Sequence, residues 1–292
     1  MTTLTNDITA HYQVETFTYY PNVTDTLDVK IRYAITTVGS QIVSPQKDCT
    51  GIMVWPATHL LCQYVCSSPK ALGERVLELG CGCGVVGVTA ALSHPSCTWV
   101  STDMDQTALT MCRENYKLNG VEGMVRTLTW ASLEHIRQLQ HELCRAQKHV
   151  KFDAIVGADI IYPATCGQGL INLFETVDML LSEEGTFVLS FCTRDGHRTP
   201  QHLIAAASNA GFVISSLPPL DPVIKQKLPP LLDAKILVLK RSENASQQNK
   251  ELGDDDCTVF PGLLAAIARA EEVCSEEEWE APFDGESYSD IE

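Results

Sequence analysis

The chain has 292 residues, 45% of them hydrophobic, and a formal net charge of −16 at pH 7. A chain of this size and composition can bury a sizeable core, as one large domain or as one domain with an appendage. No apolar run approaches the roughly eighteen residues that span a bilayer, and the N-terminal residues lack the pattern of a secretory signal. We therefore expect a soluble protein that is not bound to a membrane, and the acidic balance argues against binding to nucleic acid.

The twelve cysteines are scattered along the chain, many of them within apolar segments. Disulfide frameworks are typical of short secreted chains, so reduced thiols in the cytoplasm, or in the nucleus, are the simpler interpretation. Cys81 and Cys83 form a C-x-C pair, but no second pair and no nearby histidine completes a set of four zinc ligands. We therefore expect no metal site.

The first part of the chain predicts a β-hairpin. In residues 27–37 apolar side chains alternate with polar or small ones, which predicts a strand with one buried face, and residues 13–20 are its candidate partner. Further on, Pro56 suits the first position of a helix whose apolar stripe extends to Val65. We assign residues 1–50 to an N-terminal hairpin extension.

The middle of the chain alternates between short apolar segments and helical patterns. This alternation predicts a doubly wound, Rossmann-like α/β fold, in which helices cover both faces of a mostly parallel sheet. The last two segments are expected to pair antiparallel at the sheet edge. The seven expected strands are residues 75–79, 98–103, 124–130, 152–161, 186–191, 211–217 and 234–241. Helices are expected at residues 85–92, 105–119 and 132–147, the second capped by Asp105.

A glycine-rich turn follows the first of these strands. Gly80, Gly82, Gly84 and Gly87 satisfy a G-x-G-x-G pattern and, from Gly82, a G-x-G-x-x-G pattern. Between a buried strand and a helix, such glycines admit the close approach of a ligand, and the helix N-terminus offers free N–H groups. The turn would suit a pyrophosphate, a carboxylate or a nucleoside that bears an amino acid. Alternatively, the glycines serve only the tight turn.

Two acidic residues favour one of these ligands. Glu78 precedes the first glycine by two residues, where its carboxylate would repel a pyrophosphate but could pair with an ammonium group. Asp103 ends the second strand, where an acid can bind both hydroxyls of a ribose. These positions favour S-adenosylmethionine as the cofactor over NAD, although Glu78 could also be a turn acid and Asp103 a helix cap.

Six segments in this order resemble the seven-β-strand S-adenosylmethionine-dependent methyltransferases, and within them the methyltransferase-like protein lysine methyltransferases. The segments are GIMVWPA, VLELGCGCGVVG, VSTDMD, ENYKLN, LTWA and VGADIIYP. The match covers residues 51–191, and it implies a methyltransferase domain over residues 51–241. The cofactor-binding residues that it implies are Trp55, Glu78, Gly80, Gly82, Gly84, Asp103, Trp130 and Ala158.

The resemblance also assigns the adenine and acceptor sides of the site. Trp130 is similar to a tryptophan that packs against adenine, and Ala131 stands where the family often has glycine. The D-x-x-Y element at the end of the fourth strand implies that Asp159 orients the ε-amine of lysine and that Tyr162 supplies a hydroxyl or a ring face. The alternatives are a core aromatic residue at Trp130 and a loop cap at Asp159.

The leading hypothesis from the sequence is therefore a monomeric enzyme that transfers a methyl group from S-adenosylmethionine to a lysine side chain of another protein. Methylation of histidine, arginine or a small molecule is an alternative on the same fold. An NAD-binding oxidoreductase and a catalytically silent scaffold that keeps the cofactor pocket are two further alternatives.

The acidity is concentrated in the C-terminal part of the chain. From Arg241 onward, 15 Asp and Glu residues stand against 3 Lys and Arg residues. We assign residues 242–292 to an acidic tail that is largely disordered, in which residues 261–273 could form a short helix.

Overall fold

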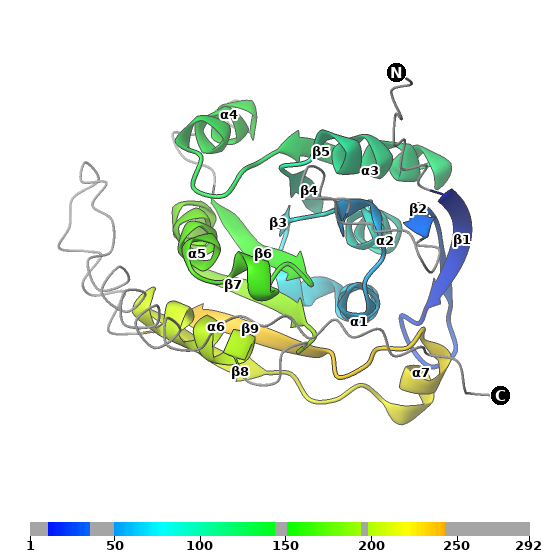
Figure 1. Ribbon diagram of the computed structural model, residues 1–292. Coiled ribbons are helices and arrows are strands. Elements are labelled where there is room, and N and C mark those ends of the chain that lie inside the picture. Colours follow the sequence, from blue (N-terminus) through cyan, green and yellow to red (C-terminus); the bar gives the residue numbers. More distant parts are fainter. Residues whose placement is uncertain (1–10, 36–49, 144–150, 194–197, 243–292) are drawn as a thin grey trace, which may run out of the picture. The chain divides into compact units, whose positions relative to one another are not determined.

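The computed structural model describes residues 11–35, 50–143, 151–193 and 198–242 (Figure 1). By its contacts the chain divides into two units, residues 1–256 and 257–292, and all described residues belong to the first. The predicted acidic tail lies outside the described residues, apart from its first position. The predicted boundaries at residues 50 and 241 remain predictions.

The centre of the first unit is a seven-stranded sheet. Its strands are β3 (Arg75–Leu79), β4 (Thr98–Asp103), β5 (Met124–Thr127), β6 (Phe152–Ala158), β7 (Leu181–Phe191), β8 (Phe212–Ser216) and β9 (Lys235–Arg241). They lie in the order β5-β4-β3-β6-β7-β9-β8. Neighbours among β5, β4, β3, β6 and β7 run parallel, whereas β9 runs antiparallel to both β7 and β8. The expected mostly parallel sheet with an antiparallel edge pair is confirmed.

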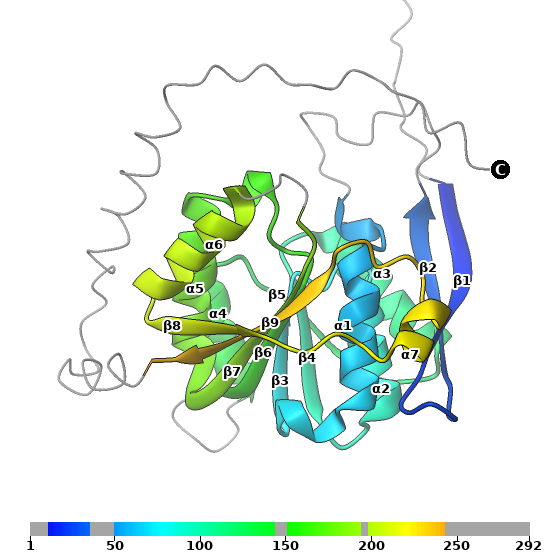
Figure 2. The same ribbon diagram turned by 90° about the horizontal axis from the view of Figure 1, so that it is seen from below.

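Helices cover both faces of this sheet. They are α1 (Pro56–Ser67), α2 (Val85–Ser93), α3 (Gln106–Leu118), α4 (Leu133–Leu143), α5 (Gln168–Leu180), α6 (Arg198–Asn209) and α7 (Pro222–Lys227). Three short 3-10 helices complete the set: η1 (Thr50–Ile52), η2 (Pro69–Leu72) and η3 (Pro163–Thr165). Helices α1, α2 and α3 lie on one side of the sheet and α4, α5 and α6 on the other (Figure 2). Strand side chains alternate accordingly: Val76 packs in the core with α1–α3, whereas Leu77 and Leu79 pack in the core with α4–α6.

The N-terminal hairpin is a separate two-stranded antiparallel sheet of β1 (His11–Tyr19) and β2 (Leu27–Ile35), as predicted. It lies beside α1, α2 and α3 (Figure 1). Phe17 and Val29, opposite one another in the register, are buried in the core of that face. The Tyr19 hydroxyl hydrogen-bonds to Nδ1 of His59 in α1 at 2.9 Å. Burial lowers the pKa of His59 to about 4, so the imidazole is neutral at pH 7.

Several element ends differ from the sequence prediction. Strand β5 ends at Thr127 and β6 at Ala158, three residues earlier than expected in each case. The apolar sequence pattern continues beyond each strand end. The reason is that Leu128, Ile160 and Ile161 are buried in the core although they belong to no strand. The sequence prediction missed two helices, α6 and, in the proline-rich loop after β8, α7. Helix α4 agrees with the prediction over 133–143; Ser132 lies just before it, and residues 144–147 of the expected helix lie outside the described residues.

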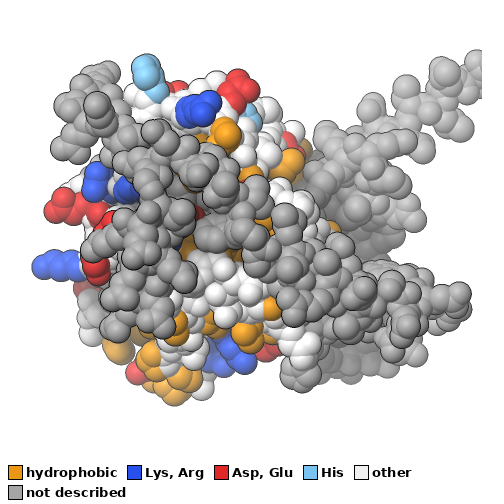
Figure 3. All heavy atoms as spheres, turned by 90° about the vertical axis from the view of Figure 1, so that its left-hand side faces the viewer, with side chains coloured by type: hydrophobic (Ala, Val, Ile, Leu, Met, Phe, Trp, Pro, Cys, Tyr) orange, Lys and Arg blue, Asp and Glu red, His pale blue; other side chains and the backbone are white. Residues whose placement is uncertain are grey.

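The surface drawn in Figure 3 mixes hydrophobic side chains with charges of both signs wherever grey atoms do not cover it. In the described part of the chain, no helix is both long and apolar enough to cross a membrane. No disulfide joins two of the described cysteines. Within the same residues, no group of three or more His, Cys, Asp or Glu side chains is placed to hold a metal ion.

Candidate functional site

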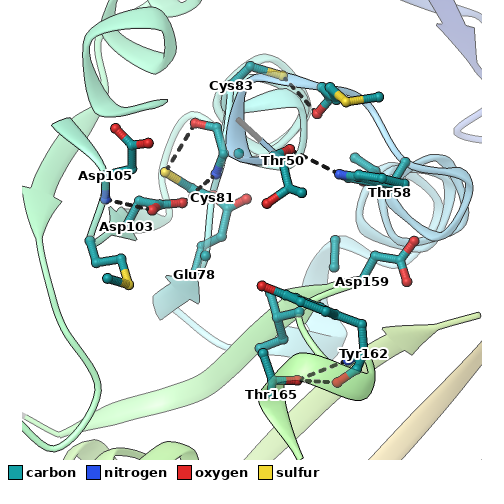
Figure 4. Close-up of a pocket in the computed structure, with 18 of the residues that line it drawn as sticks. Thr50, Thr58, Glu78, Cys81, Cys83, Asp103, Asp105, Asp159, Tyr162 and Thr165 are labelled. Carbon is teal, nitrogen blue, oxygen red and sulfur yellow. Dashed lines mark hydrogen bonds between the residues drawn. The ribbon is translucent and has the colours of Figure 1, made fainter. Parts of the chain in front are cut away.

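A cavity of about 960 Å³ opens at the carboxyl ends of β3, β4 and β6 (Figure 4). In a doubly wound sheet this edge is where ligands bind, because the strand ends and helix N-termini meet there. The lining contains nine of the ten residues assigned from the sequence: Trp55, Glu78, Gly80, Gly82, Asp103, Trp130, Ala158, Asp159 and Tyr162. The fold thus brings together residues that are more than a hundred positions apart in the chain.

The glycine loop is held in a left-handed backbone conformation. The φ angles of Gly80 and Gly82 are +62° and +54°, which glycine adopts without a steric penalty. A Cβ atom at Gly80 would approach Ile160 Cγ2 to 2.7 Å, and one at Gly82 would approach the Gly51 carbonyl oxygen to 2.7 Å. The close approach of protein atoms therefore explains both glycines, and the loop backbone faces the cavity.

Gly84 does not line the cavity. It is the N-cap of α2, with a φ of +85°, and a Cβ atom there would lie 2.5 Å from Cys112 Sγ in α3. The sequence resemblance assigns Gly84 to the cofactor site. In the structure it instead lies where α2 packs against α3.

Glu78 is buried at the base of the cavity. Its Oε2 atom accepts hydrogen bonds from Trp99 Nε1 at 3.0 Å and Ser101 Oγ at 2.7 Å. Its pKa is raised to about 7, chiefly by burial and to a smaller extent by the nearby Asp103 carboxylate, against the lowering effect of these two hydrogen bonds. A cationic ligand in the cavity would reverse this shift, because it favours the ionised carboxylate.

Asp103, the last residue of β4, connects this strand to the glycine loop. Its Oδ2 atom accepts the Gly82 N–H and its Oδ1 atom accepts the Asp105 N–H, both at 2.9 Å. Burial raises the pKa of this carboxyl group. Each oxygen accepts one backbone N–H in these contacts, which leaves acceptor capacity for the hydroxyls of a ligand. The alternative role of N-cap belongs to Asp105, whose side chain accepts the Thr107 N–H at 2.6 Å.

The described lining of the cavity is acidic. It contains four carboxyl groups, those of Glu78, Asp103, Asp105 and Asp159, and no lysine, arginine or histidine. Carboxylates that share one concave site create a negative potential that favours a cation and disfavours a phosphate.

Trp130 lies in the turn after β5, not within the strand as predicted. The next residue, Ala131, has a φ of +60°, a backbone conformation that favours glycine. The turn is held from two helices: the Ala131 N–H donates to Thr176 Oγ1 at 2.7 Å, and the Thr129 N–H donates to His135 Nδ1 at 3.1 Å. Thr176 and His135 carried no signal in the sequence, because their contacts depend on how α4 and α5 pack.

Asp159 and Tyr162 lie across the cavity from Asp103 and Asp105 (Figure 4). Asp159 directly follows β6 and has a φ of +57°, an unfavourable conformation for a residue other than glycine. Its N–H donates to the Ser190 carbonyl at 2.8 Å, which fixes this strained turn against β7. Tyr162 is the N-cap of η3, and its N–H donates to Thr165 Oγ1 at 2.9 Å. Backbone strain of this kind is concentrated at functional sites.

Several polar lining residues were not predicted from the sequence. Thr58, Thr165 and Asn172 face the same cavity from the first turn of α1, from η3 and from α5. The only available signal was that Thr58 directly follows the GIMVWPA segment. Trp55 of that segment donates its indole N–H to the Thr50 carbonyl at 3.1 Å, which holds η1 beside α1.

Comparison with known proteins identifies the family. A family profile described as "Lysine methyltransferase" matches residues 39–208, more than half of the chain. Protein N-lysine methyltransferase METTL21A of Xenopus tropicalis is 32% identical over 142 residues, which are 47% of this chain and 59% of that protein. EEF1A lysine methyltransferase 3 of Mus musculus is 33% identical over 148 residues, 49% of this chain and 56% of that protein.

A shorter match is 38% identical over 68 residues, 23% of this chain and 26% of the electron transfer flavoprotein beta subunit lysine methyltransferase of Danio rerio. The matched part of the chain spans less than two thirds of the length of each of these three relatives. The resemblance inferred from the six segments is confirmed: the chain belongs to the lysine methyltransferase family.

Proposed function

We propose that this chain is an S-adenosylmethionine-dependent enzyme that methylates the ε-amine of a lysine in another protein. The observation that supports this most is the cavity with four carboxylates and no described cationic side chain in its lining. S-adenosylmethionine carries an ammonium, a sulfonium and one carboxylate, so it is a net cation, and lysine brings a further cationic group; cofactor and substrate therefore both complement this cavity.

The cofactor would occupy the side of the cavity formed by β3 and β4. Glu78 faces its ammonium group, Asp103 accepts hydrogen bonds from its ribose hydroxyls, and the Trp130 ring covers the adenine. Gly80 and Gly82 present loop backbone to the methionine end. Trp55 and Ala158 complete the apolar wall. When bound, the cofactor supplies an electrophilic methyl group on its sulfonium.

The acceptor lysine would enter beside Asp159 and Tyr162. The Asp159 carboxylate attracts the lysine ammonium to the cavity and orients the amine after it has released its proton to solvent. Tyr162 supplies a ring face or a hydroxyl beside the incoming lysine amine. Since Asp159 is only 7% exposed, a side chain that reaches it displaces water from the reacting atoms.

The alternatives to this function predict different ligands or products. A dinucleotide would place its pyrophosphate against Glu78 and Asp103, so we expect no binding of NAD. Calorimetric titration with S-adenosylmethionine, its demethylated product and NAD tests this expectation. Binding of NAD alone would contradict the proposal and favour an oxidoreductase.

A transfer assay with tritiated S-adenosylmethionine and host extract tests the chemistry. We expect labelled protein whose acid hydrolysate contains methyllysine. Labelled methylhistidine or methylarginine would contradict the choice of lysine and favour another acceptor. Cofactor binding without any transfer would favour the silent scaffold.

We also propose that the enzyme acts as a monomer in the cytoplasm or the nucleus. The support for a reducing compartment is that no disulfide joins the described cysteines. Light scattering of the purified chain and fractionation of cells test these two statements.

A further inference from the structure

Two asparagines, Asn115 in α3 and Asn119 at its C-cap, hold the edge of β2 that faces this helix. Asn115 and Asn119 are one helical turn apart, so their side chains lie on the same face. Asn115 Oδ1 accepts the Arg32 N–H at 2.8 Å and its Nδ2 donates to the Arg32 carbonyl at 2.9 Å. Asn119 makes the same pair of contacts with Lys30, at 2.9 and 2.6 Å. The two amides thus replace a neighbouring strand along β2.

Only Asn115 also reaches the cofactor loop. The second hydrogen of its Nδ2 is donated to the Cys83 carbonyl at 2.8 Å. Cys83 lies between Gly82 and Gly84 and lines the cavity. Asn119 uses its second Nδ2 hydrogen on the Asn115 carbonyl within α3 instead.

The loop is therefore fixed from two directions. Asp103 accepts the Gly82 N–H, and Asn115 donates to the carbonyl of the following residue, Cys83. Asn115 is completely buried, so water cannot readily replace its three hydrogen bonds. A buried donor or acceptor that loses its partner is costly, and the left-handed backbone of this loop depends on such contacts.

We propose that Asn115 is a positioning residue for the cofactor loop, and that through it the N-terminal hairpin is coupled to cofactor binding. The inference rests on the proposed function, in which this loop contacts S-adenosylmethionine. Coupling between two sites is reciprocal, so a ligand in the cavity must also stabilise the hairpin edge.

The matched variants Asn115→Ala and Asn119→Ala test the proposal. Both lose the contacts with β2, so both are expected to lower the melting temperature. Only Asn115→Ala should weaken binding of S-adenosylhomocysteine, by about tenfold, as expected for a buried hydrogen bond whose partner remains unsatisfied. Its KM for the cofactor should rise similarly while kcat stays within about threefold, a split that a loss of stability alone does not produce. Asn119→Ala should bind within about twofold of the parent.

Equal affinities of the two variants would overturn the inference. If Asn115→Ala does not fold, Asn115→Ser and Asn119→Ser give the same comparison with a smaller perturbation. A second readout is hydrogen exchange of the Arg32 amide, which Asn115 accepts and which S-adenosylhomocysteine should slow in the parent. Unchanged exchange in a parent that binds the ligand would also contradict the coupling. A parent that does not bind S-adenosylhomocysteine would instead refute the proposed function.

Discussion

Glu78 shows how the cavity depends on its ligand at the scale of one residue. The carboxyl group has a pKa of about 7, because burial disfavours its charged form. Near neutral pH it is thus close to half protonated when no cation is nearby. A bound ammonium group favours the carboxylate, so binding of the cofactor should release a proton.

Affinity for S-adenosylhomocysteine is therefore expected to rise with pH through 7. Between pH 6 and pH 8 the increase should be about tenfold, because the protonated fraction of Glu78 that competes with binding disappears over this range. Glu78→Gln should bind more weakly and show no such dependence. Calorimetric titrations of both proteins with S-adenosylhomocysteine between pH 6 and pH 8 measure this dependence. A parent affinity that is constant over this range would contradict the role of Glu78.

Most residues of the site could be predicted because they hold fixed positions next to a motif. Glu78 and Asp103 were recognised from their places before the glycines and at a strand end. Asn115, His135 and Thr176 could not be predicted in this way, because each acts through a contact with a distant segment. Their roles depend on the packing of helices, which a local pattern does not specify.

At the scale of elements, the packing of α2 against α3 assigns a role to Gly84. A side chain there would meet both Cys112 Sγ, at 2.5 Å, and the Cys112 backbone Cα atom, at 3.2 Å. Relief requires the two helices to separate, because a backbone atom cannot rotate away.

Gly84→Ala should lower the free energy of unfolding more than Gly120→Ala. Gly120, the residue after the C-cap of α3, has a positive φ of +66°, but a Cβ atom there meets nothing within 4 Å. The control therefore measures the backbone penalty alone, about 1 kcal/mol, and overpacking at Gly84 should add about 1–3 kcal/mol. Urea denaturation of both variants gives the comparison. Equal losses would show that the helices accommodate the methyl group.

The elements themselves were largely predictable, since buried parallel strands are short apolar runs and the helices between them have caps or apolar stripes. Strand ends were harder to place, because Ile160 and Ile161 remain buried after β6 has ended. Helix α7 has only six residues, too few for a periodic pattern, and it was therefore missed.

At the scale of the whole molecule, the described sheet, both helical layers and the cavity are formed by residues between 11 and 242. Residues 243–292 contribute 15 acidic side chains and only two basic ones. Low hydrophobicity and high net charge are typical of segments that do not form a core.

Deletion of residues 243–292 should therefore leave a folded domain that binds S-adenosylhomocysteine with the parent affinity. Thermal unfolding and calorimetric titration of the shortened chain check this. A melting temperature several degrees lower, or a loss of affinity, would contradict it and would assign a stabilising role to the apolar segment at residues 261–273.

The proposed function divides the cavity into a cofactor side, at Asp103, and an acceptor side, at Asp159. The paired variants Asp103→Asn and Asp159→Asn remove one charge on each side, and asparagine tolerates the left-handed backbone at position 159. Asp103→Asn should weaken cofactor binding by about 1–3 kcal/mol, through loss of a charge-assisted hydrogen-bonding partner. Asp159→Asn should bind the cofactor within a few-fold of the parent.

The most direct test is single-turnover methyl transfer by Asp159→Asn, with saturating S-adenosylmethionine, to the protein that accepts the label from the parent. We predict a rate at least about a hundredfold below the parent rate, because the group that orients the lysine amine is lost while the cofactor remains bound. A rate close to that of the parent would contradict the account, since Asp159 would then be only a structural residue at the end of β6.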